Sequence, residues 1–205
     1  MIPLASKLSS RWRHRALPWA VVVAGSLPAA VLAGRAVAGD LGANPIETVT
    51  HVTGEWALRL LLASLAVTPL RRLTGWSALA PCRRTLGLLG FAYACAHLAT
   101  FVGLDHFFDA RSIAEDVLER PYVTAGTAAF LCLVPLAVTS TRGWQRRLGA
   151  RWVRLHRLVY VAAVAAVIHY LWLVKADLRA PLLHAAVLGV LLAARLRRRR
   201  ARDAS

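Results

Sequence analysis

The amino-acid sequence predicts an all-α membrane protein, a polytopic bundle of six transmembrane helices with both chain ends in the cytoplasm. Three observations lead to this prediction. Of the 205 residues 58% are hydrophobic, the charged residues gather in blocks, and six apolar runs each come close to the length that crosses a bilayer. A soluble domain interleaves charged and apolar residues, so that class is excluded. No linker, internal repeat or low-complexity segment divides residues 1–205, which we treat as a single domain.

The six apolar runs follow one another with polar connections between them. A transmembrane helix needs about 20 predominantly apolar residues. The first run follows a basic tail, the second ends before Arg71, the third follows Arg84, and the fourth opens at Pro121. The fifth ends before Lys175, and the sixth is short and ends in arginines. In chain order we expect helices at about 17–37, 52–70, 85–104, 121–140, 155–174 and 181–196.

The first run has a second interpretation. A basic stretch, an apolar run and Ala36-Val37-Ala38 before Gly39 also fit a cleavable signal peptide. We favour a retained helix, because this run is about 20 residues long and the apolar region of a signal peptide is about 7–15. Cleavage would leave the orientation of the other five helices unchanged.

The orientation follows from the charges in the connections. Twenty of the 26 basic residues lie in alternate segments, and eight of the ten acidic residues lie in the segments between them. Basic connections face the cytoplasm by the positive-inside rule, so the net charge of +16 reflects membrane orientation and not nucleic-acid binding. The basic residues are Lys7, Arg11, Arg13, Arg15, Arg71, Arg72, Arg83, Arg84, Arg142, Arg146, Arg147, Arg151, Arg154, Arg157 and the arginines from Arg195 to Arg202. The acidic residues are Asp40, Glu47, Asp105, Asp109, Glu115, Asp116, Glu119 and Asp177.

The connection at 105–120, DHFFDARSIAEDVLER, is the longest on the outer side. Its apolar residues Ile113, Val117 and Leu118 recur at near-helical spacing, which predicts a short helix on the membrane surface. Its acidic residues either form a solvated face, the commoner case, or dock a basic partner. The C-terminal arginines are expected to anchor the last helix at an anionic membrane surface.

Two classes of site are not supported by the sequence. Cys82, Cys95 and Cys132 show no CxxC spacing, and two of them lie in apolar runs, so we expect packing roles and no disulfide framework. There is also no P-loop and no glycine-rich dinucleotide fingerprint. The chain therefore carries no recognisable nicotinamide site of its own.

Two histidines stand at the same depth of two parallel helices. His97 lies 13 residues after Arg84, and His169 lies 12 residues after Arg157. A histidine inside the bilayer is costly and by default marks a functional site. Small residues follow one face beside each histidine and would leave room for a bulky flat ligand, although small residues also serve close helix packing. These residues are Gly87, Gly90 and Ala94 beside His97, and Ala162, Ala165 and Ala166 beside His169.

The two histidines therefore predict a haem held between His97 and His169. Zinc or copper is disfavoured, because no third or fourth Cys, Asp or Glu lies at that depth. His156 lies roughly 20 Å from His169 and about 140° around a straight helix, so the two share no face unless the helix bends. Level with His156, the third helix carries Arg83 and Arg84. His156 is either a ligand or a solvated interfacial histidine.

The other four histidines are not expected to bind haem. His51 most simply makes a surface hydrogen bond, the alternatives being ligation, an ion pair with Glu47 or Glu55, or the lining of a quinone or flavin pocket. His106 is expected to be solvated, His184 to be buried and hydrogen-bonded, and His14 to belong to the basic tail.

Four segments closely resemble the MsrQ family, the haem-binding membrane subunits of periplasmic methionine sulfoxide reductase systems. They are LGANPIETVTHVTGEWALRLLLASLAVTPLRRL, RRTLGLLGFAYACAHL, RPYVTAGTAAF and LAVTSTRGWQRRLGARWVRLHRLVYVAAVAAVIHYLWLVK. The resemblance runs from about 40 to 175. The wider relatives are ferric-reductase-like transmembrane domains, which include NADPH oxidases and metalloreductases and stack haems between histidines of the third and fifth helices.

The resemblance implies three haem-associated histidines, His97, His156 and His169, and haem b as the cofactor. It also implies FMN, for which no residue here argues independently. NADPH oxidases carry two histidines on each of the two helices, but this chain has arginine where the second one of the third helix would stand. A symmetric arrangement of two haems is therefore not expected.

The resemblance further implies a membrane cytochrome of the bacterial inner membrane with no catalytic residue of its own. Electrons would come from a cytoplasmic flavin reductase or from quinone and would pass to a periplasmic molybdenum-containing methionine sulfoxide reductase subunit. This partner repairs oxidised proteins, since methionine sulfoxide is reversibly reduced. The alternatives are a cofactor-free transporter or assembly scaffold, for which Glu55 with Arg59 is the only intramembrane candidate, and a stand-alone ferric or quinone reductase.

Overall fold

The computed structural model describes residues 4–203 and the side chains of residues 16–197. Within these residues the chain is helical, without a strand, so the all-α prediction is confirmed. The basic residues and His14 of the N-terminal tail, and the arginines after Arg197, lie outside the described side chains. The elements are α1 Leu4–Val37, α2 Pro45–Thr74, the 3₁₀ turn Ser77–Leu79, α3 Cys82–Thr100, the π-helical turn Phe101–Asp105, α4 Ala110–Glu119, α5 Pro121–Val138, α6 Arg142–Leu148, α7 Ala150–Leu155, α8 Leu158–Leu173 and α9 Arg179–Asp203.

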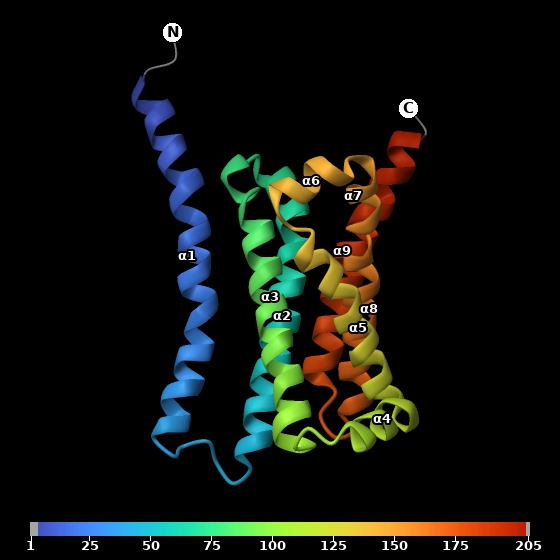
Figure 1. The fold of residues 1–205 in the computed structure, drawn as a ribbon. Helices are drawn as coiled ribbons and strands as arrows, with labels where there is room; N and C mark the ends of the chain where they lie inside the picture. The colour runs from blue at the N-terminus through green and yellow to red at the C-terminus, as the bar shows by residue number, and fades with distance from the viewer. Residues whose placement is uncertain (1–3, 204–205) are drawn as a thin grey trace.

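Five helical segments of the described chain are long and apolar enough to cross a membrane. They are Ala16–Val37, Ser77–Asp105, Pro121–Val138, Ala150–Leu173 and Arg179–Arg197. Helix α2 has 30 residues and runs alongside them, but it is not among the five (Figure 1). It carries Glu55 and Arg59 in its apolar part, where they form an ion pair. The structure therefore shows five candidate spans where the sequence predicts six.

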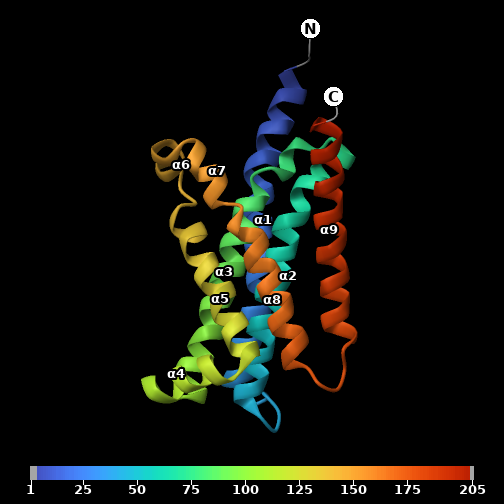
Figure 2. The same ribbon diagram turned by 90° about the vertical axis from the view of Figure 1, so that its right-hand side faces the viewer.

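The connections segregate to two ends of the bundle (Figure 1). At the end that we call the α4 end lie helix α4, the α1–α2 connection and the α8–α9 connection. At the opposite end, the α6 end, lie α6, α7, the α2–α3 connection, the start of α1 and the last turns of α9. Figure 2 shows that α4 and α6 project to the same side of the bundle, at its two ends.

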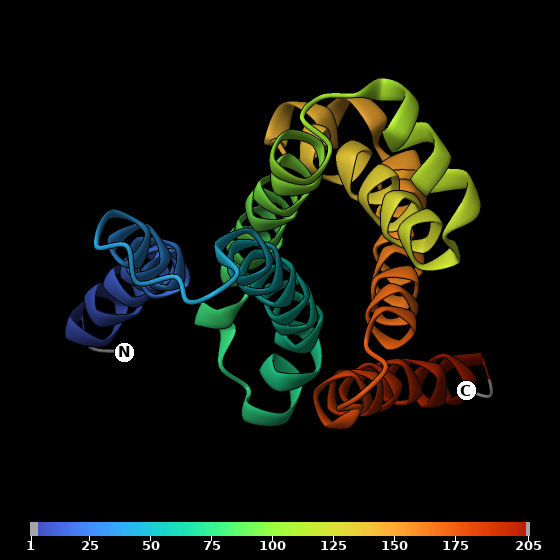
Figure 3. The ribbon, with the colours of Figure 1, turned by 90° about the horizontal axis from the view of Figure 1, so that it is seen from below.

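Two helix pairs form the centre of the molecule. Helix α2 packs most closely on α3, and α5 packs most closely on α8; the view along the bundle shows the two pairs with α1 and α9 at the periphery (Figure 3). Gly90 makes the first contact possible, because a methyl group there would lie 3.2 Å from the Ala57 carbonyl oxygen of α2. Leucines of α2 then meet α8 and α9 in the main core cluster, which contains Leu58, Leu61, Leu62, Leu65, Ala163, Val167 and Leu188.

Helix α1 packs on α3, α2 and the 3₁₀ turn, and Tyr93 of α3 adds two hydrogen bonds to it. The Tyr93 hydroxyl donates a hydrogen bond to the Gly25 carbonyl (2.8 Å) and accepts one from the Ala29 amide (3.0 Å). These backbone groups are four residues apart in the continuous helix α1, next to Pro28. Apolar side chains on the opposite face are more than half exposed, as expected of a surface that meets lipid; they are Trp19, Val23, Leu27 and Val31.

Three local features differ from the expected helices or refine them. The helix expected at 155–174 is interrupted, because α7 ends at Leu155 and α8 begins at Leu158. The Arg157 and Tyr160 amides bond carbonyls three residues earlier, which tightens the chain at the interruption. Helix α6 has no counterpart in the prediction. The short helix predicted within 105–120 is confirmed as α4, which begins after the N-cap Asp109.

Candidate functional site

The structure brings the rings of His97 of α3 and His169 of α8 together, edge to face, in the half of the bundle nearer the α4 end. Their ring centroids lie 6.1 Å apart and their planes are inclined by 74°. Both side chains are partly buried. The two residues come from different helix pairs, α2–α3 and α5–α8, so the two histidines meet across the boundary between the pairs.

Each histidine is fixed by a hydrogen bond from its Nδ1 atom to a backbone carbonyl. His97 Nδ1 lies 2.9 Å from the Thr50 oxygen in α2, and His169 Nδ1 lies 2.6 Å from the Tyr122 oxygen in α5. A carbonyl only accepts, so Nδ1 is the protonated nitrogen of each neutral ring and Nε2 keeps its lone pair. A metal-binding histidine is ordinarily held in this way, its second nitrogen donating to a carbonyl or carboxylate.

A glycine one helical turn after each acceptor makes room for the ring. A methyl group on Gly54 would lie 2.9 Å from His97 Nδ1 and Cε1, and one on Gly126 would lie 2.8 Å from His169 Nδ1. Such contacts are too short for a real Cβ atom, so only glycine lets each imidazole reach the carbonyl beside it. The two histidine contacts repeat one pattern, since in both the histidine follows its acceptor by 47 residues.

Sequence reasoning missed all four of these supporting residues, Thr50, Gly54, Tyr122 and Gly126. The signal that could have found them is the repeated spacing of acceptor, glycine and histidine in the two helix pairs. The expectation that Gly90 leaves room beside His97 is wrong, because this glycine lies against the α2 backbone. Close helix packing, the alternative interpretation of the small residues, explains that position.

The pair has the donor set and separation that a haem iron requires. An imidazole nitrogen lies about 2 Å from a bound metal and the ring centre about 1 Å further, so two imidazoles on opposite sides of one ion have centroids about 6 Å apart. The observed separation is 6.1 Å. Among the side chains that the structure describes, no three His, Cys, Asp or Glu residues come together as a metal site. Two histidines alone suit haem, whose ring supplies the remaining ligands, better than a bare zinc or copper ion.

His156 occupies a different place, at the interruption between α7 and α8. Its ring stacks on the Trp152 ring with centroids 3.8 Å apart, and its Nδ1 lies 3.2 Å from the Trp152 carbonyl oxygen. A second backbone carbonyl, that of Leu136, also lies within hydrogen-bond reach of the His156 ring, unlike the single carbonyl beside each of the other two histidines. The structure does not bring His156 together with the His97–His169 pair.

His156 lines a cavity of about 210 Å³ at the α6 end, which we call the His156 cavity. Apolar side chains form most of its wall, and Arg83, Arg84 and Gln145 add polar groups. The described side chains at this end include no acidic residue, so an anionic group would meet no repulsion there. The polar and aromatic members of the wall are Ser64, Arg83, Arg84, Phe91, Ser140, Gln145, Trp152 and His156.

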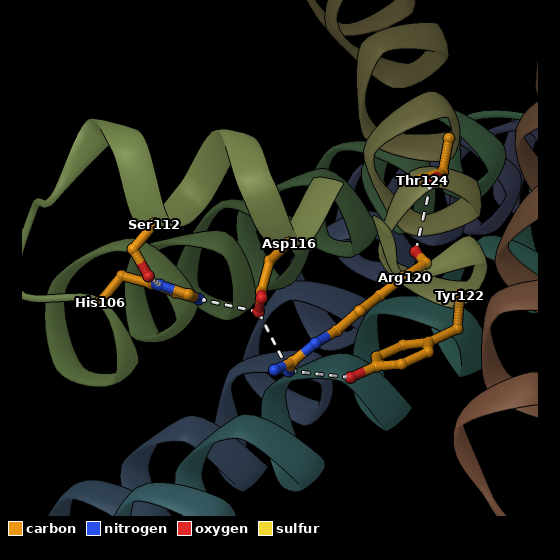
Figure 4. Close-up of polar contacts among 6 residues, drawn as sticks. All are labelled: His106, Ser112, Asp116, Arg120, Tyr122 and Thr124. Carbon is orange, nitrogen blue, oxygen red and sulfur yellow. Dashed lines mark hydrogen bonds and ion pairs between the residues drawn. The ribbon is translucent and has the colours of Figure 1, made fainter. Parts of the chain in front are cut away.

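The remaining histidines lie elsewhere. His51 is exposed. His184 is buried, with its Nδ1 2.7 Å from the Ala180 carbonyl oxygen, as the sequence predicts. The expectation that His106 is solvated is wrong: its side chain is only 10% exposed, and its Nε2 lies 3.3 Å from Asp116 Oδ2 (Figure 4).

Comparison with known proteins places these features in a family. Residues 53–167, which include His97 and His156 and end two residues before His169, match the family described as the ferric reductase-like transmembrane component. The chain is 57% identical over 186 residues to the protein-methionine-sulfoxide reductase heme-binding subunit MsrQ of Rhodospirillum rubrum, covering 88% of this chain and 89% of the relative. It is 48% identical over 177 residues to the protein of the same name from Herminiimonas arsenicoxydans, and 51% identical over 166 residues to that from Caulobacter vibrioides. These cover 85% and 80% of this chain and 81% and 79% of the relatives.

Proposed function

Since the chain belongs to the MsrQ family of ferric-reductase-like transmembrane proteins, we propose that it is a b-type membrane cytochrome that delivers electrons to a methionine sulfoxide reductase. The observation that carries this proposal is the His97–His169 pair, with both Nδ1 atoms bonded to carbonyls and both Nε2 atoms left to bind iron. The relatives are named as heme-binding subunits, which agrees with this donor set.

His97 and His169 are the residues that would hold haem b. A haem with two imidazole ligands supplies reversible one-electron transfer and leaves iron no open coordination position, which suits electron transfer rather than oxygen activation. The protein's own part is to orient the imidazoles through the Thr50 and Tyr122 carbonyls and to surround them with helices α2, α3, α5 and α8. No residue of this chain acts on the sulfoxide.

A second cofactor belongs in the His156 cavity under this proposal. His156 offers an imidazole, and Arg83 and Arg84 offer cations to an anionic substituent, such as a haem propionate or the phosphate of FMN. The third helix carries these arginines where a second histidine would stand, so a haem here would have His156 as its one histidine ligand. FMN is the alternative occupant and rests on the family resemblance.

The same proposal assigns each end of the bundle to one side of the membrane, and thereby gives electron transfer a direction. The molecule spans the bacterial inner membrane six times, with α2 as the sixth span beside the five apolar helices. The α6 end, rich in arginine, faces the cytoplasm and receives electrons from a flavin reductase or from quinone. The α4 end faces the periplasm and meets the molybdenum-containing catalytic subunit, which repairs oxidised methionines.

The transporter alternative would rest on Glu55 and Arg59. These side chains pair with each other, and the Arg59 guanidinium lies 5.0 Å over the Trp56 ring. Helix α2 continues unbroken from Pro45 to Thr74 through this pair, whereas transporters commonly bind their substrates at interrupted helices. The arrangement is therefore better explained as a neutralised pair within a packed helix.

Visible spectra of the detergent-purified protein, oxidised and dithionite-reduced, test the proposal together with a pyridine haemochrome count per chain. We expect a low-spin b-type spectrum from the wild type. The substitutions His97→Ala and His169→Ala should each abolish the contribution of the haem between these two residues. His51→Ala is the control, because the His51 side chain is exposed. A colourless wild-type protein, expressed with adequate haem, would contradict electron transfer.

The count also tests the His156 cavity. Two haems per chain in the wild type and one in His156→Ala would support a second haem there. One haem in both proteins, with FMN released on denaturation only from the wild type, would assign the cavity to flavin. Reduction of ferric salts or quinones at full rate without the periplasmic subunit would instead favour a stand-alone reductase.

A further inference from the structure

A chain of polar contacts crosses the α4 end of the molecule (Figure 4). Asp116 of α4 lies at its centre, with Oδ2 3.3 Å from His106 Nε2 and 3.0 Å from Arg120 Nη1. The same Arg120 nitrogen donates to the Tyr122 hydroxyl at 3.4 Å. The contacts thus join the segment after α3, helix α4 and the first turn of α5.

Asp116 is held in place on the side toward α3. Its side chain is only 15% exposed, although it is a carboxylate on a surface helix. His106, its partner, packs its ring on Phe101 with centroids 4.4 Å apart and bonds Ser112 Oγ through Nδ1 at 2.8 Å. Phe101 directly follows α3, the helix that carries His97. The Asp116 carboxylate is therefore held at the end of α3 and is not free to turn toward solvent.

The other end of the chain of contacts reaches the His169 hydrogen bond. Tyr122 lies in the first turn of α5, directly after Pro121, and the first turn is the part of a helix that frays most easily. Its carbonyl oxygen accepts from His169 Nδ1 at 2.6 Å, and its ring centroid lies 6.2 Å from that of His169. The contacts with the Tyr122 hydroxyl and with Asp116 raise the pKa of Arg120 above its ordinary value.

The corresponding support of His97 contains no charge. Thr50, whose carbonyl accepts from His97, bonds through its hydroxyl to the Thr100 hydroxyl at 3.1 Å. Thr100 in turn donates to the His97 carbonyl at 2.7 Å. One histidine is thus supported by hydroxyl groups inside a helix pair, and the other by an ion pair that belongs to a separate surface helix.

We propose that Asp116 and Arg120 are positioning residues for His169, because they hold Tyr122 so that its carbonyl accepts the Nδ1 hydrogen. This inference rests on the proposed function, in that its consequence is felt by a haem that His169 binds. A firm hydrogen bond from Nδ1 makes Nε2 a stronger donor to iron, and a stronger donor favours the ferric state. Loosening Tyr122 therefore weakens haem binding and shifts the reduction potential to more positive values.

The substitution Asp116→Asn tests the proposal, with Glu115→Gln as the matched control. Glu115 also pairs with an arginine four residues away on the same helix, Arg111 at 2.9 Å, but both side chains are more than half exposed. We expect Asp116→Asn to bind haemin about tenfold more weakly, the lower range for a supporting partner of a metal ligand. Its haem midpoint potential should move positive, and Glu115→Gln should match the wild type in both measurements. Haemin titration of the apoprotein and redox potentiometry provide the values.

Two further variants separate positioning from stability. Tyr122→Phe removes only the hydroxyl that Arg120 contacts and should move the potential in the same direction, whether or not Asp116→Asn folds. Asp116→Glu keeps the charge and should recover part of the wild-type potential. An Asp116→Asn or Tyr122→Phe protein that unfolds at lower temperature but keeps wild-type affinity and potential would overturn the role. Wild-type protein that takes up no haemin would refute the proposed function as well.

Discussion

At the scale of single residues, the two histidine contacts depend on glycine for a reason of space. A helix carbonyl already accepts from the amide four residues later, and a side chain at that later residue stands beside the oxygen. With glycine at 54 and 126, the oxygens of Thr50 and Tyr122 stay open to a second donor from the neighbouring helix. The imidazoles occupy the volume that a methyl group would fill. Gly54 and Gly126 therefore allow the His97 and His169 rings to lie where they do.

Gly126→Ala should displace the His169 ring, because the added methyl group would lie 2.8 Å from Nδ1 and 3.1 Å from Cε1. We expect haem affinity to fall about 10- to 100-fold, the effect of losing a partner that orients a metal ligand. Spectral titration with haemin measures it. The control is Gly189→Ala on the exposed side of α9, where an added methyl meets no atom within 4 Å. Unchanged affinity in Gly126→Ala would contradict this account of the contact.

The sequence predicts the histidines of the site and not their supports. Counting from the flanking arginines is enough to place His97 and His169 at one depth, since the helix rise is constant. Which neighbours surround a ring depends on how the helices cross, and spacing along one helix carries no information on that. For this reason Gly90 is expected beside the ligand but packs on α2, while Gly54 and Gly126 are missed. His106 is misplaced for the same cause, because its partner Asp116 comes from another element.

At the scale of elements, the apolar runs and the charges between them locate the transmembrane helices. They do not predict the interruption and the short helix that lie in polar parts of the chain. The interruption between α7 and α8 falls in a stretch without glycine or proline, so no helix-breaking residue predicts it. Helix α6 is seven residues long and mostly polar, too short for a periodic pattern. These two features contribute Gln145, Trp152 and His156 to the wall of the His156 cavity, which is absent from the predictions.

The attachment of α1 provides a prediction at the same scale. Tyr93→Phe removes the hydroxyl that bonds Gly25 and Ala29, at a net cost of about 1 kcal/mol. Amide hydrogen exchange in the middle of α1 should accelerate about fivefold, since 1.4 kcal/mol corresponds to a factor of ten. Amides of α3 and α8 near the histidines serve as the internal control and should keep their rates. Equal exchange of α1 in both proteins would show that other contacts hold the helix.

At the scale of the whole molecule, the charges and the lipid-facing surface agree on one orientation. Exposed apolar side chains are spread over α1, α5, α8 and α9, an arrangement that water would penalise and a bilayer accommodates. The arginine-rich connections lie together at the α6 end, and the acidic ones lie together at the α4 end. Under the positive-inside rule, this segregation of charge supports the proposal that the α6 end faces the cytoplasm.

Single cysteines at the two ends test that orientation. In a background with Cys82, Cys95 and Cys132 changed to alanine, Glu115→Cys should react with a membrane-impermeant maleimide on intact spheroplasts. Gln145→Cys, exposed at the α6 end, should react only after the membrane is opened. The opposite pattern would reverse the proposed direction of electron flow, and labelling of both positions from outside would contradict the number of spans.

Selection should act unevenly along the first helix. Its polar contacts with the bundle include the Gly25 and Ala29 backbone groups at Tyr93, and Gly25 also packs on Leu89. Elsewhere a lipid-facing position such as Trp19 or Val23 needs only to stay apolar. Mutations in α1 can therefore accumulate as near-neutral drift while the paired helices are held by their geometry.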